Sequence, residues 1–196
     1  MAWLRELFSY AFIVRAMSVG LLVALCAALL GVSLVLKRYS MIGEGLSNVG
    51  FGSLSLAMAL NMAPLKVSIP IVVLAAFLLL RMSENSRIKG DAAIALISSS
   101  ALAMGVIVTA AAGGMNLDVC NYMFGSILAM SKSDVALSVG LSVAVLLLFV
   151  LCYTQIFAVT LDEPFTRSTG TKVGAYNMLI ALLTALTIVV GMRIMG

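Results

Sequence analysis

Long, continuously apolar segments constrain this chain more than any other feature of its sequence. A helix needs about 20 mostly apolar residues to cross roughly 30 Å of hydrocarbon. Five segments approach or exceed that length with one charged side chain or none: residues 16–36, 43–63, 92–116, 135–157 and 173–192. We therefore expect each of them to form a membrane-spanning helix.

A sixth apolar segment, residues 67–80, is shorter and contains Pro70. It can just cross the membrane if residues 62–66 approach it along the interface. Transmembrane β-strands alternate between apolar and polar residues, whereas these segments are continuously apolar. The sequence thus predicts an all-α fold, in which residues 1–196 form a single polytopic transmembrane helical bundle with about six spanning helices.

The composition agrees with a protein that is embedded in a membrane. Hydrophobic residues make up 63% of the chain and charged residues 10%, and the mean hydropathy is +1.18. A soluble domain of 196 residues has too little interior to bury so much apolar surface. Basic cytoplasmic loops explain the net charge of +4, so no nucleic-acid partner is needed. We expect a multi-pass protein of the cytoplasmic (plasma) membrane.

Two segments differ from simple spans. Residues 1–15 mix apolar and charged side chains, and we interpret them as an N-terminal interfacial helix rather than a cleaved signal. Residues 117–130 are apolar but too short to cross the membrane, and they contain Asp118 and Gly125. We expect a short re-entrant or interfacial element there, on the outer face. A plain extracellular loop is the alternative.

The basic residues favour one orientation in the membrane. If the spans alternate, seven of the 12 Lys and Arg residues fall on one face: Lys37, Arg38, Arg81, Arg87, Lys89, Arg167 and Lys172. Short cytoplasmic loops are enriched in such residues. The bias places the N-terminus outside and three loops inside, at residues 37–42, 81–91 and 158–172.

One acidic side chain, Glu44, lies inside a predicted span that is otherwise uncharged. Acids in such places are costly, and by default they indicate functional sites. In a helix, Glu44, Asn48, Gly52 and Ser55 share one face. A carboxylate and an amide oxygen one turn apart supply ligands for a hard or borderline divalent cation. This face is therefore a candidate metal site.

A structural role would explain the same residues. Glu44 lies near the end of its predicted helix, where it would pair with Lys37 or Arg38 at the cytoplasmic headgroups. The small residues of the face would then pack against another helix. Both interpretations stay open from the residues alone.

The predicted cytoplasmic loop 160–172 carries the signals of a short helix. Asp162, Glu163 and Pro164 form a favourable helix N-terminus, with acids at the positive end of the dipole. Gly170 would end such a helix. An ordinary solvated loop has a similar composition, so both possibilities remain.

The chain shows no sign of catalytic or cofactor chemistry of its own. Its cysteines, Cys26, Cys120 and Cys152, are widely spaced, and it contains no histidine. Neither a disulfide framework nor a structural zinc site is indicated. The GxxxxGK[ST] loop that binds phosphates is also missing. We expect a membrane component that is not an enzyme and binds no cofactor, so that any ATP must be bound by a partner subunit.

Four stretches of the sequence are characteristic: LVLKRYSMIGEGLSNVGFGSLSLAMAL, SENSRIKGDAAIALISSSALAMGVIV, DVCNYMFGSILAMSKSDV and FAVTLDEPFTRSTGTKVGAYNMLIALLTALTIVVGMRIMG. Together they resemble the permeases of the ABC-type zinc, manganese and iron uptake family. The resemblance covers essentially the whole chain from residue 15 onward. The FGSILA and DEPF…G elements, in this order and spacing, are its most specific features.

By this resemblance, Glu44 stands where the family usually has Asp, and Asn48 where it usually has His. Ser99 matches the position of a further histidine that some members carry. The resemblance implies a weak, oxygen-lined path for a metal ion through Glu44, Asn48 and Ser99, rather than a tight zinc site. The family's coupling helix, which docks on the ATP-hydrolysing subunit, corresponds here to Asp162, Glu163, Pro164, Phe165 and Gly170.

The resemblance implies the permease subunit of an ABC importer that translocates divalent metal ions, zinc or manganese. It would work as a homodimer with two ABC ATPase subunits and an extracytoplasmic metal-binding protein. Family members continue with further helices beyond the point that matches Gly196, so we expect a truncated or incomplete permease. A secondary cation transporter or channel subunit without an ATPase is the alternative, since an intramembrane acid supports both classes equally.

Overall fold

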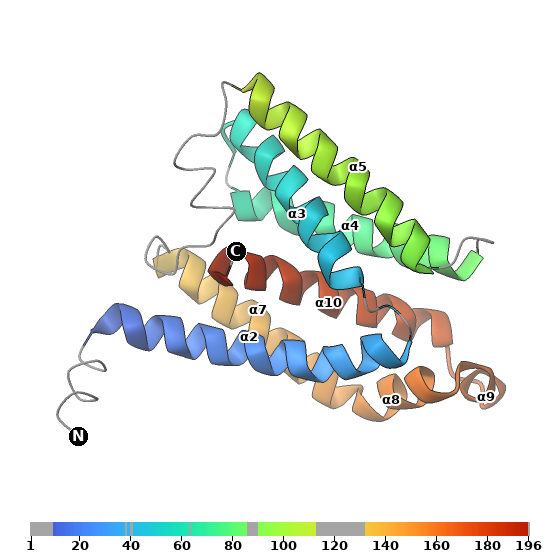
Figure 1. Ribbon diagram of the computed structural model, residues 1–196. Coiled ribbons are helices and arrows are strands. Elements are labelled where there is room, and N and C mark those ends of the chain that lie inside the picture. Colours follow the sequence, from blue (N-terminus) through green and yellow to red (C-terminus); the bar gives the residue numbers. More distant parts are fainter. Residues whose placement is uncertain are drawn as a thin grey trace.

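In the computed structural model, residues 10–37, 39, 41–62, 64–85, 90–112 and 132–195 are described. The regular elements in these ranges are all helices (Figure 1): α2 (Ala11–Leu36), α3 (Ile42–Ala59), α4 (Pro64–Asn85), α5 (Gly90–Ala111), α7 (Lys132–Leu151), α8 (Tyr153–Leu161), α9 (Glu163–Ser168) and α10 (Val173–Met195). The predicted all-α fold is confirmed. The interfacial helix expected over residues 1–15 lies mostly outside the described residues, and the element expected near 117–130 lies wholly outside them.

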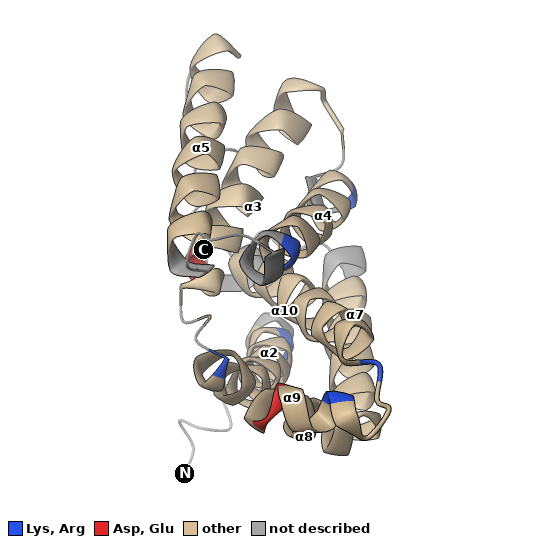
Figure 2. Cartoon of the chain, turned by 90° about the vertical axis from the view of Figure 1, so that its right-hand side faces the viewer, with Lys and Arg blue, Asp and Glu red and all other residues tan. Residues whose placement is uncertain are grey.

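Long apolar helices make this chain a multi-pass membrane protein. Three described stretches are long and apolar enough to cross a bilayer by themselves: Ile13–Leu36, Ala92–Ala111 and Val173–Met192. The α7 and α8 helices make a fourth span if they are counted together. Figure 2 shows that the charged residues gather at helix ends and around α9, while the long helices are otherwise uncharged. This distribution is the one that a bilayer requires.

The predicted spans 43–63 and 67–80 also form helices, but these are more polar or shorter. The α3 helix has 18 residues, among them Glu44 and Asn48, and the apolar part of α4 covers only Lys66–Leu79. Since α3 contacts α4, α5 and α10, protein covers much of its surface. A helix that is enclosed in this way does not need the apolar exterior of one that faces lipid.

The α10 helix lies at the centre of the bundle, between two groups of helices (Figure 1). Its spanning stretch is 50% buried, compared with 28% for those of α2 and α5. One apolar cluster, which includes Leu46 and Val72, joins α10 to α3, α4 and α5. A second cluster, which includes Leu30 and Phe149, joins it to α2, α7 and α8. The two halves of the molecule therefore meet on α10.

The predicted span 135–157 is broken at Cys152, so the expectation of one uninterrupted helix is corrected. Cys152 has φ −99° and ψ 11°, and α8 leaves α7 at an angle of 70°. The turn places Ile156 among the buried side chains of α2, α7 and α10. It leaves the exposed rings of Tyr153 and Phe157 stacked, with centroids 5.9 Å apart. Because exposed aromatic rings are typical of the headgroup region, α8 fits at the membrane surface.

Candidate metal path and the short helix α9

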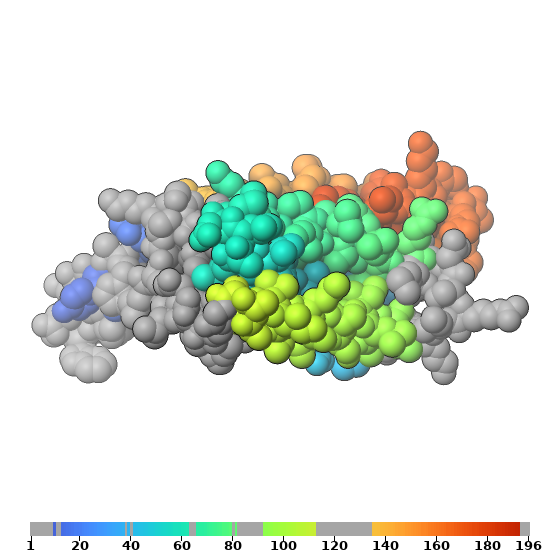
Figure 3. All heavy atoms as spheres, turned by 90° about the horizontal axis from the view of Figure 1, so that it is seen from above, coloured from blue at the N-terminus to red at the C-terminus, as the bar shows by residue number. Residues whose placement is uncertain are grey.

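The polar face of α3 lies against α5. Figure 3 shows atoms of α3 (teal) and α5 (yellow-green) meeting on one face of the molecule. In order along both helices, the contacts are Gly45 with Ile94, Asn48 with Ser98, Gly52 with Ala101 and Ser55 with Thr109. The residue numbers rise together on both helices, so α3 and α5 are parallel. Small residues allow such a close approach of two backbones. The packing role considered for Gly52 and Ser55 therefore holds.

Asn48 and Glu44 lie toward the beginning of this contact. The side-chain nitrogen of Asn48 donates a 2.6 Å hydrogen bond to Oγ of Ser98, and Asn48 is partly buried. Glu44 lies one turn earlier, in the first turn of α3, and is exposed. The structure thus places both predicted residues at the same end of α3.

The residue that meets Asn48 is Ser98 and not Ser99, which is exposed. Successive residues of an α-helix point about 100° apart, so only one of the two serines faces α3. A pattern in the sequence indicates which serine faces α3, because Ser98, Gly105 and Thr109 form a stripe of small and polar residues at helical spacing. Ser99, which the resemblance matches to the position of a further histidine, is the residue next to Ser98 in this stripe.

The chemistry at this end of α3 is that of oxygen ligands. Since Asn48 binds Ser98 through its nitrogen, its Oδ1 can accept a hydrogen bond or coordinate a cation. The carboxylate of Glu44 supplies two further oxygens. Hard divalent cations favour such donors. In the described parts of the chain, no group of three His, Cys, Asp or Glu side chains is placed to hold a metal ion.

The helix predicted within 160–172 is confirmed as α9, which has a well-formed start and end. Oδ1 of Asp162 accepts a 2.9 Å hydrogen bond from the backbone N–H of Phe165, which is the arrangement of an N-cap. Pro164 occupies the first turn, where its missing N–H costs nothing. Gly170 has φ +83°, a left-handed conformation that strongly favours glycine after a helix.

One face of α9 is fixed to the protein, and the other is open. The hydroxyl of buried Thr166 lies 2.9 Å from the carbonyl oxygen of Ala158 and 2.7 Å from that of Asp162. Phe165, by contrast, is 66% exposed. A shallow, open depression is lined by Glu163, Pro164, Arg167 and Ser168. A rigid short helix with an exposed aromatic side chain is a suitable surface for binding another protein.

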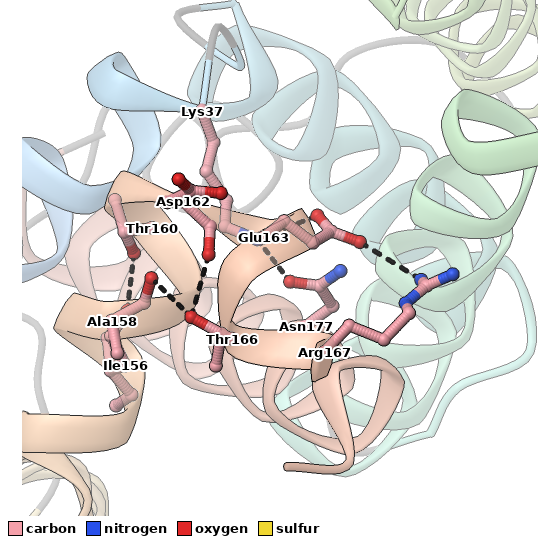
Figure 4. A network of polar contacts seen from close by, with 9 residues as sticks. All are labelled: Lys37, Ile156, Ala158, Thr160, Asp162, Glu163, Thr166, Arg167 and Asn177. Atoms are coloured by element: carbon pink, nitrogen blue, oxygen red, sulfur yellow. Dashed lines mark hydrogen bonds and ion pairs between the residues drawn. The ribbon is translucent and has the colours of Figure 1, made fainter. Parts of the chain in front are cut away.

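Lys37, at the end of α2, reaches both α9 and α10 (Figure 4). Its Nζ lies 3.8 Å from Oε2 of Glu163 and donates a hydrogen bond to Oδ1 of Asn177. Lys37, one of the two partners considered for Glu44, thus pairs with Glu163. The other, Arg38, lies outside the described residues. The contact confirms that the predicted loops 37–42 and 158–172 lie on the same side of the molecule.

Comparison with known proteins identifies the family. The sequence model of the ABC 3 transport family matches residues 9–196. The chain belongs to the ABC 3 transport family. The fold of this ABC 3 member is similar to that of PsaBC from Streptococcus pneumoniae, solved in complex with a Fab. The TM-score is 0.82 with 28% sequence identity, and the similarity covers 100% of this chain and 70% of that chain.

Several relatives of this ABC 3 chain are named for metal transport. The manganese transport system membrane protein MntC of Halalkalibacterium halodurans is 26% identical over 191 residues, which are 97% of this chain and 65% of the relative. The manganese import system permease protein ScaB of Streptococcus parasanguinis is 29% identical over 185 residues, which are 94% of this chain and 66% of the relative. The high-affinity zinc uptake system membrane protein ZnuB of Haemophilus influenzae is 24% identical over 182 residues, which are 92% of this chain and 69% of the relative.

These relatives confirm the predicted family of metal-ion ABC permeases. The chain spans about two thirds of their length, from 65% to 69%.

Proposed function

We propose that this chain is the permease subunit of an ABC importer that carries divalent metal ions across the plasma membrane. It would act as a homodimer with two ATPase subunits, which bind and hydrolyse ATP, and would receive the metal ion from an extracytoplasmic binding protein. The observation that carries the proposal is the match of the ABC 3 family over residues 9–196. The names of the relatives, which refer to manganese and zinc transport, support the metal cargo.

The geometry of α9 supports a partner on the cytoplasmic side. Asp162 caps this helix, Thr166 anchors it, and Phe165 projects from its exposed face. We propose that Phe165 and the neighbouring Pro164 enter a pocket of the ATPase subunit. An exposed aromatic anchor that is held rigidly loses little conformational entropy when it binds.

We propose that the metal ion passes the beginning of α3, where Glu44 and Asn48 supply oxygen ligands. Ser98, which holds the Asn48 side chain, would orient the amide. The predicted ligand Ser99 is exposed on α5 and would contribute only if the ion approached that surface. Oxygen donors suit Mn²⁺ better than Zn²⁺, which prefers imidazole and thiolate. Manganese is therefore the cargo that these donors favour.

The rival class, a secondary cation carrier or channel subunit, gives no reason for a rigid α9 with an exposed phenylalanine. The family assignment also supports the ABC class. The two classes differ in their need for an ATPase, which provides the test.

The test is capture of the ATPase by affinity-tagged permease in detergent. We expect wild-type chain and a Leu161→Ala control to retain the ATPase, because Leu161 is exposed on α8, outside α9. Phe165→Ala should reduce capture about tenfold or more, as expected for a central aromatic anchor. Capture that is equal for Phe165→Ala and wild type would remove α9 from the interface. If wild type captures no ATPase, the ABC proposal is wrong.

A further inference from the structure

The most enclosed ion pair in the described part of the chain joins Lys37 to Glu163. The side chain of Lys37 is 8% exposed, whereas that of Glu163 is 37% exposed. Burying an ammonium group is costly unless an opposite charge and hydrogen-bond acceptors surround it. Glu163 supplies the charge, and buried Asn177 supplies an amide oxygen. Lys37 therefore depends on the position of α9 and α10 for its stability.

Glu163 also pairs with a second cation, but the two pairs are not equivalent. Nη2 of Arg167 lies 3.3 Å from Oε1 of Glu163, one turn along α9, and the Arg167 side chain is 72% exposed. Exposed pairs of this kind contribute little. Both residues of the Arg167–Glu163 pair also belong to α9, so this pair stabilises α9 internally. The Lys37 pair, in contrast, connects α9 to the end of α2.

Backbone hydrogen bonds join the end of α2 to the start of α3 by way of Tyr39. The backbone N–H of Lys37 donates to the carbonyl of Ser33 (3.1 Å), and that of Tyr39 donates to Leu34 (2.9 Å). Leu34 and Tyr39 also pack against the same apolar cluster. The N–H of Ile42, at the start of α3, then donates to Tyr39 (3.1 Å). Tyr39 is thus hydrogen-bonded both to the last turns of α2 and to the first residue of α3.

From these contacts we propose that Lys37 is a positioning residue that couples α9 to the beginning of α3. When α9 is displaced, the Glu163 carboxylate moves, the buried Lys37 ammonium follows it, and the turn at Tyr39 shifts the helix that carries Glu44 and Asn48. This role rests on the proposed function of α9 as the ATPase-docking helix. It assigns the transmission of that movement to one ion pair between helices that are distant in the sequence.

The test compares Lys37→Met with Lys172→Met in the complete complex of permease, ATPase and binding protein in proteoliposomes. Lys172 is exposed beside the same loop, so its replacement controls for loss of a cytoplasmic positive charge. We measure Mn²⁺ transported per ATP hydrolysed. Lys37→Met should lower this ratio about tenfold, within the range of coupling energies between sites, while ATPase capture persists. Lys172→Met should change it by no more than about twofold, as for an exposed charge.

A second pair of variants distinguishes coupling from a loss of folding. Glu163→Gln alters the half-exposed partner and should lower the same ratio, and the reversed pair, Lys37→Glu with Glu163→Lys, should restore part of it. An unchanged ratio in Glu163→Gln, or a reversed pair no better than Lys37→Glu alone, would overturn the proposal.

Hydrogen exchange keeps this proposal separate from the proposed function, because it needs neither metal nor ATP. In the permease alone, Lys37→Met should speed exchange both in α9 and at residues 39–46, and Lys172→Met should not. Faster exchange confined to α9, or no change at all, would contradict the coupling of α9 to α3, whatever the complex transports. Absence of ATP-driven transport in wild type would instead remove the proposed function.

Discussion

Gly52 of α3 lies directly against the backbone of Ala101 in α5, so closely that a Cβ atom on Gly52 would be 2.8 Å from the Ala101 carbonyl oxygen. Gly105 makes the reciprocal contact, since a Cβ there would lie 3.0 Å from the Cα of Gly52. Two parallel helices are thus held at a distance that only glycine permits. This contact keeps the face of α3 that bears Asn48 against α5.

Replacing Gly52 by Ala should separate these helices. The added methyl group meets backbone, which cannot move aside as a flexible side chain does, and overpacking of this kind costs about 1–3 kcal/mol. We expect a lower melting temperature of the purified permease in detergent. The control is Gly140→Ala in α7, where a Cβ meets nothing within 4 Å, and which should be neutral or stabilise by about 0.5–1 kcal/mol. Equal melting of Gly52→Ala and Gly140→Ala would show that the helices are not in close contact.

The hydrogen bond from Asn48 to Ser98 should have a measurable but small energy. Interhelical hydrogen bonds in membranes average about 0.6 kcal/mol in double-mutant cycles. We expect a coupling energy of this size from the melting of Asn48→Ala, Ser98→Ala and the double variant. A cycle with Ser99→Ala in place of Ser98→Ala should give no coupling. Coupling to Ser99 and none to Ser98 would contradict the Asn48–Ser98 hydrogen bond.

The N-cap of α9 offers a test that separates capping from charge. Asp162→Ala removes the acceptor for the Phe165 N–H and should destabilise α9 by about 1 kcal/mol. Asp162→Asn loses the charge but keeps an oxygen acceptor, and it should retain most of the helix. Limited proteolysis between α8 and α10 measures the difference. Similar cleavage of both variants would mean that the charge, rather than the cap, maintains α9.

Gly170 should tolerate substitution less well than its neighbour Gly174. Both positions have room for a Cβ, but Gly170 has φ +83°, a conformation that costs a non-glycine residue about 1–2 kcal/mol. Gly170→Ala should therefore speed proteolysis between α9 and α10, whereas Gly174→Ala should not. If both variants are cleaved like wild type, the left-handed turn after α9 is not required.

The sequence predicted the helices well because long apolar segments have few alternatives in a membrane. It predicted α9 because Asp162, Pro164 and Gly170 are local signals whose effect does not depend on distant contacts. The break at Cys152 carries no Gly or Pro. It accompanies the burial of Ile156 against other helices, and only the assembled bundle determines that burial. Such breaks cannot be predicted from the local sequence.

The candidate site was predicted only in part, for a similar reason. Glu44 and Asn48 follow from helical spacing within one segment. The hydrogen bond of Asn48 to Ser98 depends on the rotation of α5 about its axis, which the spacing within one segment does not give. The pairing of Lys37 with Glu163 joins residues from opposite parts of the chain, and charge counting could suggest only that both lie on the cytoplasmic side.

ATP-driven uptake of Mn²⁺ into proteoliposomes, by wild type and Glu44→Gln in complex with the ATPase, tests the central claim most directly. The control is Ser47→Ala, whose hydroxyl bonds only to carbonyls of its own helix in the described structure. We expect wild type and Ser47→Ala to take up Mn²⁺ only when ATP is present. Glu44→Gln should lose most of the uptake while still binding the ATPase, because an amide coordinates a cation more weakly than a carboxylate. Uptake that is independent of ATP, or equal in Glu44→Gln and wild type, would contradict the account.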